Sequence, residues 1–184
     1  MRDVPGPAPF LVEQLEHLAR VALCAPEAPV LDLACGSGRN ALAVARRGLH
    51  VVGLDRDASK LHQLVREARS EGLPVGAIQA DLEDGTAMPL ARGRCTAILV
   101  FRYLYRPLAP LLVEGLRPGG LLIYETFTLC QRGLAQGPSN PAFLLEPGEL
   151  PGLFPGLQVE QSFEGWVAHP WPQYVARLVA RKPR

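Results

Sequence analysis

The stretch that decides the fold is Val30-Leu-Asp-Leu-Ala-Cys-Gly-Ser-Gly-Arg-Asn40. Its pattern predicts an apolar strand, then a tight glycine turn, then a helix that starts directly behind the turn. Glycines in such a turn let a ligand contact bare backbone at the mouth of a parallel sheet. Asp32 lies within the predicted strand. A carboxylate at this position favours a ligand that carries positive charge and disfavours a pyrophosphate.

Strands and helices alternate along the chain from residue 30 to residue 125. This alternation predicts a parallel sheet with helices on both faces and right-handed crossovers. The predicted fold class is therefore α/β, a doubly wound Rossmann-like sheet of seven strands that is mostly parallel with an antiparallel last strand. The predicted strands are 30–34, 50–54, 75–80, 95–101, 121–125, 157–163 and 174–180, and the predicted helices are 10–24, 39–47, 59–71, 107–116 and 146–153.

The chain has 184 residues, enough for one hydrophobic core, and it shows no internal repeat and no linker. We therefore expect a single domain over residues 1–184. Within it, the helix in residues 1–29 is expected to roof the ligand bound at the glycine turn. Residues 127–145 are polar, rich in glycine and proline, and too long for a plain connection. They are expected to form a loop on the substrate side.

Composition narrows the function classes. The formal net charge is +1 at pH 7, so no strong field points to nucleic acid or to an anionic membrane. No apolar run approaches about 18 residues, and no basic-then-apolar leader opens the chain. The four cysteines and four histidines show no metal-ligand spacing. We therefore expect a cytoplasmic protein without a metal, a nucleic-acid partner or a membrane partner. The sequence does not indicate the oligomeric state.

The glycine turn is compatible with two kinds of cofactor. Gly36-Ser-Gly38-Arg-Asn-Ala41 satisfies the pattern G-x-G-x-x-A, and Asp55 follows 17 residues after Gly38. Taken alone, this also matches a dinucleotide fingerprint, in which a pyrophosphate rests on the helix N-terminus. Asp32 would oppose those phosphate charges. S-Adenosylmethionine has no phosphate and carries an ammonium and a sulfonium group, so Asp32 suits it better, and the helix N-terminus can receive its carboxylate.

Four motifs, in the expected order, resemble those of the class I S-adenosylmethionine-dependent methyltransferases. They are the glycine motif at 32–38, Asp55, the pair Asp81-Leu82, and the turn Leu-Arg-Pro-Gly-Gly-Leu-Leu at 116–122. The resemblance implies that Asp55 binds both ribose hydroxyls and that Asp81-Leu82 lies where the adenine amino group is recognised. One departure is Ala34, where the family usually has glycine. Because alanine is the smallest change, we expect the pocket to survive with a slightly shifted turn.

A looser resemblance is to the tellurite-resistance type of methyltransferase. It is carried by Gly38-Arg-Asn-Ala41, by Tyr124-Glu-Thr-Phe127 and by Asn140-Pro-Ala-Phe-Leu-Leu-Glu-Pro-Gly-Glu149. This likeness does not fix a substrate. The family resemblance as a whole implies S-adenosyl-L-methionine as the cofactor. The residues expected to bind it are Asp32, Ala34, Gly36, Gly38, Asn40, Asp55, Arg56, Asp81, Leu82 and Phe101.

The exits of the fourth and fifth predicted strands hold the candidate catalytic residues, because in an open α/β sheet this edge faces the bound ligands. The implied reaction is an in-line methyl transfer from the sulfonium to a nucleophilic atom of a small molecule. It requires no metal, and it requires a base only if the nucleophile arrives protonated. The candidates for that base are Tyr103, Tyr124 and Glu125. The candidates to receive an anionic acceptor are Arg102, Arg106 and Arg132.

Other interpretations of the same residues stay open. A non-catalytic module would bind S-adenosylmethionine as a structural or sensory ligand, without turnover of any acceptor. A nicotinamide-dependent oxidoreductase would be protected from heat by NAD(H) and not by S-adenosylmethionine. At the level of single residues, Asp32 could cap nearby backbone amides, and Asn40 could have a structural role in the first turn of its helix.

Overall fold

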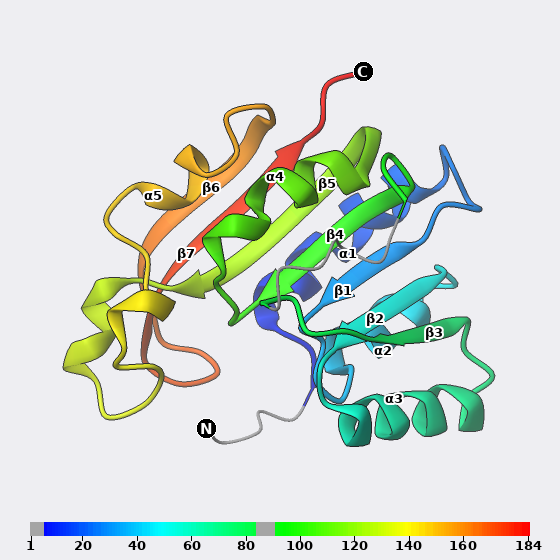
Figure 1. Cartoon of the computed structure of the whole chain (residues 1–184), viewed down its shortest axis with the longest axis horizontal. Coiled ribbons are helices and arrows are strands. Elements are labelled where there is room, and N and C mark those ends of the chain that lie inside the picture. Colours follow the sequence, from blue (N-terminus) through cyan, green and yellow to red (C-terminus); the bar gives the residue numbers. More distant parts are fainter. Residues whose placement is uncertain (1–5, 84–90) are drawn as a thin grey trace.

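The computed structural model describes residues 6–83 and 91–184. Seven strands form one sheet in the order β3-β2-β1-β4-β5-β7-β6 (Figure 1). β1 to β5 run parallel, and β7 runs antiparallel to both β5 and β6. The predicted fold class and the antiparallel last strand are confirmed. The elements are α1 (Pro9–Ala22), β1 (Val30–Leu33), α2 (Arg39–Ala45), β2 (Val51–Asp55), α3 (Ala58–Ser70), β3 (Val75–Gln79), β4 (Cys95–Phe101), the 3-10 helix η1 (Arg106–Leu108), α4 (Ala109–Gly115), β5 (Leu116–Phe127), the 3-10 helices η2 (Leu129–Gly133) and η3 (Pro141–Phe143), α5 (Glu149–Gly152), β6 (Gln158–Val167) and β7 (Gln173–Arg181).

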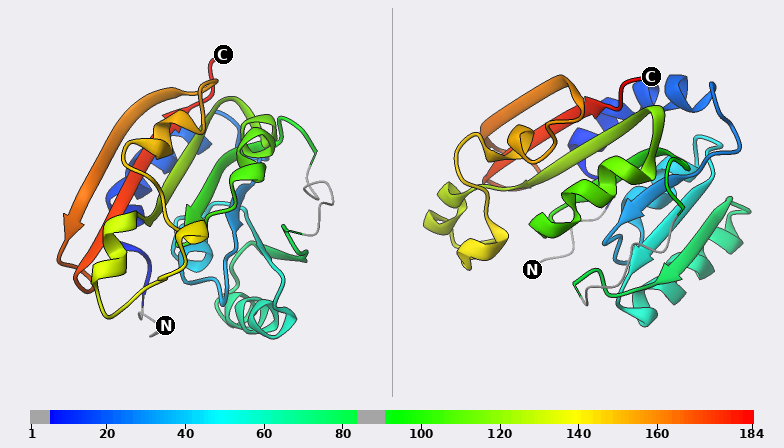
Figure 2. Two further views of the ribbon diagram at one scale, coloured as in Figure 1. Left: turned by 60° about the vertical axis from the view of Figure 1, so that its left-hand side comes forward. Right: turned by 45° about the horizontal axis from the view of Figure 1, so that its top comes forward.

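Two hydrophobic clusters, one on each face of the sheet, hold these layers together. On one face, Leu18 of α1, Val44 of α2 and Leu64 of α3 pack against the sheet. On the other face, Leu112 of α4 and Leu150 of α5 do the same. Figure 2 shows the sheet between these two helix layers. β4 is buried along its whole length, because it lies in the centre of a sheet that is covered on both faces.

The strand order creates the crevice in which a ligand can bind. From β1 the chain moves outward to β2 and β3, and then returns to β4 on the other side of β1. Leu33 at the end of β1 pairs with Val100 near the end of β4. Ligands of open α/β sheets bind at the carboxyl ends of the strands, where the strand order reverses. The glycine turn after β1 and the exit of β4 therefore lie side by side at this edge.

β5 differs from the prediction, because it includes the segment 117–120 that the sequence pattern presents as a turn. Cys95 of β4 pairs with Leu116, but Ala97 already pairs with Leu121, so β5 carries a bulge at this point. A Cβ atom on Gly120 would lie 3.1 Å from two backbone carbonyl oxygens of β4. Glycine is therefore required where β5 passes close to β4, and β5 continues through this position.

Most other predicted elements are present with shifted ends. The predicted helix 107–116 is divided into η1 and α4, and the predicted helix 146–153 is limited to α5. β6 and β7 are both longer than predicted. Residues 127–145 hold η2 and η3, and Thr128 at the start of this segment forms a β-bridge with Leu145 at its end. No helix in residues 6–83 and 91–184 has the length and apolar character needed to cross a membrane.

Candidate active site

Three residues of the turn between β1 and α2 adopt a left-handed backbone conformation. The φ angles are 53° at Ala34, 56° at Gly36 and 81° at Gly38. Left-handed φ favours glycine, because a Cβ atom crowds the following carbonyl oxygen at a cost of roughly 1–2 kcal/mol. This geometry explains why glycine is usual at the position of Ala34. The alanine is accommodated in the same region of φ, and it borders the cavity described below.

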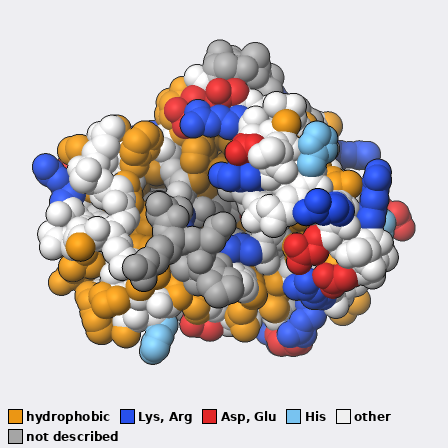
Figure 3. Space-filling model, turned by 90° about the horizontal axis from the view of Figure 1, so that it is seen from below, with side chains coloured by type: hydrophobic (Ala, Val, Ile, Leu, Met, Phe, Trp, Pro, Cys, Tyr) orange, Lys and Arg blue, Asp and Glu red, His pale blue; other side chains and the backbone are white. Residues whose placement is uncertain are grey.

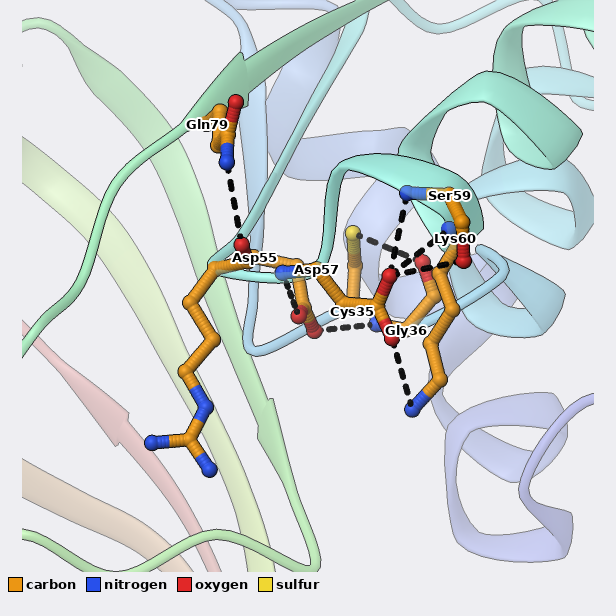
Figure 4. Close-up of polar contacts among 8 residues, drawn as sticks. Cys35, Gly36, Asp55, Asp57, Ser59, Lys60 and Gln79 are labelled. Atoms are coloured by element: carbon orange, nitrogen blue, oxygen red, sulfur yellow. Dashed lines mark hydrogen bonds and ion pairs between the residues drawn. The ribbon is translucent and has the colours of Figure 1, made fainter.

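Asp55, the last residue of β2, holds the glycine turn in place. Its Oδ2 accepts a hydrogen bond from the Gly36 amide at 2.7 Å, and its Oδ1 accepts one from the Asp57 amide at 2.9 Å (Figure 4). A carboxylate offers about four acceptor positions. Two of them therefore remain for hydroxyl groups of a ligand in the adjoining cavity, which Asp55 also lines.

Asp32 is buried in β1, with only 2% of its surface exposed. Its Oδ2 accepts a hydrogen bond at 2.9 Å from the amide of Ala41 in the first turn of α2. Burial raises the pKa of the carboxyl group to about 7, although this hydrogen bond and the charge of Arg39 lower it. Asp32 is not among the residues that line the two cavities described below. Asp32 therefore caps a backbone amide at the start of α2, which is the structural alternative that the sequence left open. Its charge would act on a cofactor from behind the turn.

A cavity of about 310 Å³, here called the smaller cavity, lies at the carboxyl ends of the strands beside the glycine turn. Five predicted cofactor residues border it, namely Ala34, Asp55, Arg56, Asp81 and Leu82. The residues Lys60, Ala80, Glu83, Tyr103 and Phe143 complete its lining. Lys60 follows Asp55 closely and lies in the first turn of α3 (Figure 4), a position that sequence reasoning could have included. Phe143 comes from a distant segment and has no local sequence signal.

The remaining predicted cofactor residues shape the site without lining the smaller cavity. Asn40 is buried, and its Oδ1 accepts a hydrogen bond from the Ala8 amide at 2.9 Å, which ties the segment before α1 to α2. Phe101 at the end of β4 packs against Phe10, with the ring centroids 6.5 Å apart. Asn40 thus has the structural role that the sequence left open.

Replacing Gly38 by alanine is expected to destabilise the protein by about 2–3 kcal/mol. Gly38 precedes α2 with a φ of 81°, and a Cβ atom there would lie 2.2 Å from Cδ1 of the buried Leu64. The left-handed conformation and the overpacking each contribute about 1 kcal/mol or more. Chemical denaturation measures the change. Gly48→Ala is the control, since Gly48 also has a positive φ of 79° but has open space around it. Equal losses in both variants would contradict the role of Leu64.

A second cavity of about 730 Å³, here called the larger cavity, adjoins the exit of β4. Its lining consists of Arg102, Tyr103, Leu104, Phe127, residues 135–138, Phe143 and Trp171. Tyr103 and Phe143 line both cavities, so the two share a wall. Figure 3 shows a hollow in this side of the molecule, bordered by hydrophobic side chains, with many charged side chains gathered to one side of it. The arrangement suits two ligands that bind next to each other.

Tyr103 is the predicted catalytic residue that faces the cavities. Its hydroxyl group lies 3.3 Å from Oε1 of Glu83, to which it donates a hydrogen bond. Burial and the neighbouring carboxylates of Glu83 and Asp81 raise the pKa of Tyr103 well above its usual range. The side chain is therefore a neutral phenol at physiological pH. It can orient an acceptor by hydrogen bonding, but it is a poor base.

The structure does not bring Tyr124 and Glu125 to either cavity, which corrects their expected placement. The Tyr124 hydroxyl donates to the backbone carbonyl of Tyr103 at 2.9 Å, and its ring packs on Phe154 in the core. Glu125 is 3% exposed and accepts a hydrogen bond from Nε of Arg177 at 2.7 Å. Both groups already have internal partners, because successive residues of β5 point into the cores on opposite faces.

Arg102 is the arginine that the structure places in the larger cavity. Its φ is 59°, an uncommon value for a residue other than glycine. Its guanidinium lies 5.4 Å from the ring centroid of Trp171, which stacks on Phe127. Among the described residues, the buried Nε atom of Arg102 finds no hydrogen-bond partner, and burial lowers the pKa of the group. A buried donor without a partner is a candidate contact for a bound anion.

The two other candidate arginines do not border the larger cavity. Arg106 is paired with Glu149 and also donates to the carbonyls of Ala142 and Leu144, so it anchors the segment around η3. Arg132 lies exposed at the end of η2. In the described part of the chain, no group of three or more His, Cys, Asp or Glu side chains could hold a metal ion.

Comparison with known proteins identifies the class to which this fold belongs. Residues 30–120 match a family model described as a methyltransferase domain. TehB from Haemophilus influenzae is 19% identical, with 91% of this chain and 62% of that chain covered and a TM-score of 0.70. A SAM-dependent methyltransferase from Aquifex aeolicus is 16% identical, with 95% and 93% covered and a TM-score of 0.66. No curated protein matches the chain.

A third solved structure is that of geranyl diphosphate C-methyltransferase from Streptomyces coelicolor A3(2), in complex with Mg²⁺, geranyl diphosphate and S-adenosyl-L-homocysteine. It is 18% identical, with 93% of this chain and 79% of that chain covered and a TM-score of 0.68. At these sequence identities, the structural similarity shows that the fold is shared.

The fold, the glycine turn and the matched domain together define a class I S-adenosylmethionine-dependent methyltransferase. The protein is an enzyme of this class that uses S-adenosyl-L-methionine, and it resembles TehB in fold. The resemblance, the enzyme class and the cofactor predicted from the sequence are thereby confirmed. This result favours a methyltransferase over both alternatives that the sequence left open.

Proposed function

We propose that this enzyme transfers the methyl group of S-adenosylmethionine to a small anionic molecule bound in the larger cavity. The observation that carries the proposal is the wall that Tyr103 and Phe143 form between the two cavities. When bound, the cofactor supplies a methyl group on a sulfonium, which is a good leaving group. A cofactor in the smaller cavity and an acceptor in the larger one would then be neighbours.

The residues of the smaller cavity fit the cofactor. Asp55 keeps two acceptor positions for the ribose hydroxyls after its two contacts with backbone amides. Asp81 and Leu82 border the same cavity, at the position where the family resemblance implies recognition of adenine. Gly36 is partly exposed and has no close side-chain neighbour, whereas Gly38 is buried against Leu64 and lets the turn pack closely on α3. We propose that these five residues hold the cofactor, together with Ala34 and Arg56.

The larger cavity supports an acceptor with an apolar body and an anionic group. Its volume of about 730 Å³ lies within the range of about 300–1,000 Å³ that is usual for small-molecule sites. Aromatic rings form much of its wall, and Arg102 is its charged group among the described lining residues. The geranyl diphosphate enzyme shows that a neighbour in fold acts on a molecule with this combination.

The chain's own residues would contribute mainly by positioning the acceptor. Arg102 would bind its anionic group, Tyr103 would donate a hydrogen bond, and Phe127 and Trp171 would exclude water. Alignment of two bound reactants is worth roughly 7–11 kcal/mol in favourable cases. Because Tyr124 and Glu125 have internal partners, we do not assign either of them as a base.

The proposal is tested by measuring S-adenosylhomocysteine release in the presence of a panel of small carboxylates and phosphate esters. We expect turnover with a subset of these anions, together with calorimetric binding of the cofactor product. Binding of the product without turnover of any acceptor would instead favour the non-catalytic module. The predicted cytoplasmic location and the exclusion of nucleic acid stay predictions.

Replacing Arg102 by glutamine is expected to raise the KM for an anionic acceptor by about 10- to 100-fold. The loss of one charge-assisted contact costs about 1.5–3 kcal/mol. The affinity for S-adenosylhomocysteine should stay unchanged, because Arg102 does not line the smaller cavity. Arg132→Gln is the matched control and should leave both values unchanged. A KM that is insensitive to Arg102 would contradict its assignment as the acceptor's partner.

A further inference from the structure

A third cavity lies away from the two already described, and arginine dominates its wall. It has a volume of about 300 Å³. Its lining includes Arg20 in the last turn of α1, Arg117 near the start of β5, Arg181 at the end of β7 and Arg184 beyond it. These side chains come from three distant parts of the chain. We call it the arginine cavity.

Arg117 is held rigidly in this cavity. Its Nε donates to Oγ1 of Thr96 at 3.2 Å, and its terminal nitrogens donate to the carbonyls of Val21 at 2.9 Å and Pro118 at 3.2 Å. A guanidinium has five N–H groups. Two of them therefore remain, in a fixed orientation, for a ligand. A binding group that is already ordered loses little conformational entropy when the ligand binds.

Arg181 is fixed in the same way, but its charge is compensated. It donates to the carbonyl of Gly119 at 3.0 Å, lies 2.9 Å from Nε2 of His17, and forms an ion pair with Glu160. The only carboxylate that pairs with the cavity's side chains within residues 6–83 and 91–184 is that of Glu160, which contacts both Arg181 and His17.

Arg20 and Arg184 add further positive charge to the arginine cavity. Neither of them forms an ion pair or a hydrogen bond with any residue in the described part of the chain. Within the described residues, Arg117 donates only to neutral oxygen atoms. The cavity therefore combines an ordered guanidinium with two uncompensated ones, and it carries an excess of positive charge.

We propose that the arginine cavity binds a compact phosphate-bearing anion, such as a diphosphate group. Planar guanidinium groups match phosphate oxygens in geometry as well as in charge. A volume of about 300 Å³ suits a small ligand and not a nucleic-acid strand. The site is distinct from the proposed methyl-transfer site, because Ala8, just before α1, contacts Asn40 of α2, whereas Arg20 lies at the other end of α1.

The test is isothermal titration of the whole protein with pyrophosphate, ADP and adenosine, in the presence of saturating S-adenosylhomocysteine. The saturating ligand keeps ADP and adenosine out of the smaller cavity. We expect pyrophosphate and ADP to bind and adenosine not to bind. The double variant Arg20→Ala/Arg184→Ala should weaken pyrophosphate binding at least tenfold, because it removes the two uncompensated charges while leaving the ordered Arg117 in place.

Arg69→Ala is the matched control, since Arg69 also lies in the last turn of a helix but borders none of these cavities. It should leave the pyrophosphate affinity unchanged. The proposal is overturned if pyrophosphate does not bind, if the double variant binds it as tightly as the wild type, or if Arg69→Ala weakens it equally. Binding of adenosine as tight as that of ADP would also overturn it, since the phosphates would then contribute nothing.

Discussion

Replacement of Asp55 by alanine is expected to weaken the binding of S-adenosylhomocysteine by about 100-fold or more. The carboxylate is the proposed acceptor of both ribose hydroxyls, and each hydrogen bond to a charged group contributes about 1.5–3 kcal/mol. The loss of two such bonds amounts to at least about 3 kcal/mol, and each 1.4 kcal/mol is a factor of ten. Isothermal titration calorimetry measures the affinity directly.

The same replacement removes the two hydrogen bonds by which Asp55 holds the Gly36 and Asp57 amides. Asp55→Asn removes part of both roles, because its carbonyl oxygen can still accept one backbone hydrogen bond, whereas its amide nitrogen accepts neither from the other backbone N–H group nor from a hydroxyl. We expect the asparagine variant to lie between the wild type and the alanine variant in both affinity and thermal stability. An unchanged affinity in the alanine variant would reject Asp55 as the ribose ligand.

Replacement of Asp32 by asparagine is expected to stabilise the protein at pH 8 and to have a smaller effect at pH 5. Burial raises the pKa of Asp32 from 3.8 to about 7 in the folded protein. Between these values the unfolded chain has released the proton and the folded chain has kept it. The stability of the wild type therefore falls as the pH rises through this window. Asparagine does not ionise, and its carbonyl oxygen can still accept from the Ala41 amide.

The expected size of this effect follows from the pKa difference. One pKa unit corresponds to about 1.4 kcal/mol, so Asp32 costs the wild type about 3 kcal/mol between pH 5 and pH 7, and little more up to pH 8. Urea unfolding at pH 5 and pH 8 measures the difference for both proteins. The asparagine variant should also bind S-adenosylmethionine more weakly at pH 8, because it lacks the negative charge behind the turn. A variant that is less stable than the wild type at pH 8 would contradict the raised pKa.

The predictions for Asp32 and Asp55 show how much the sequence alone says about the role of a carboxylate in a strand. The sequence indicates that Asp32 and Asp55 lie at the ends of neighbouring strands, beside the same turn. It does not indicate that Asp32 faces the start of α2 while Asp55 faces a cavity. This difference depends on the direction of each side chain relative to the two layers of helices, which is a property of packing.

The candidate catalytic residues show the same limit more clearly. Tyr103, Tyr124 and Glu125 all lie near the carboxyl edge of the sheet, where Glu125 pairs with Phe101 at the end of β4, although β5 continues to Phe127. Tyr124 points into the core under α4 and α5, and Glu125 meets Arg177 of β7. Only Tyr103, which follows the end of β4, borders the cavities. A sequence motif predicts at which edge of the sheet a residue lies, but the pleat of the strand decides toward which face of the sheet its side chain points.

The sequence by itself determined the mostly parallel α/β sheet, the glycine turn and the position beside it of several residues that we propose to bind the cofactor. These features follow from local physics, namely the spacing of apolar residues, the need for left-handed φ in a tight turn and the order of strands along the chain. Only the tertiary structure decided the larger cavity and the arginine cavity. Their walls join segments such as Arg102 with Trp171, or Arg20 with Arg181, and contacts across such sequence distances arise from packing, for which no local pattern exists.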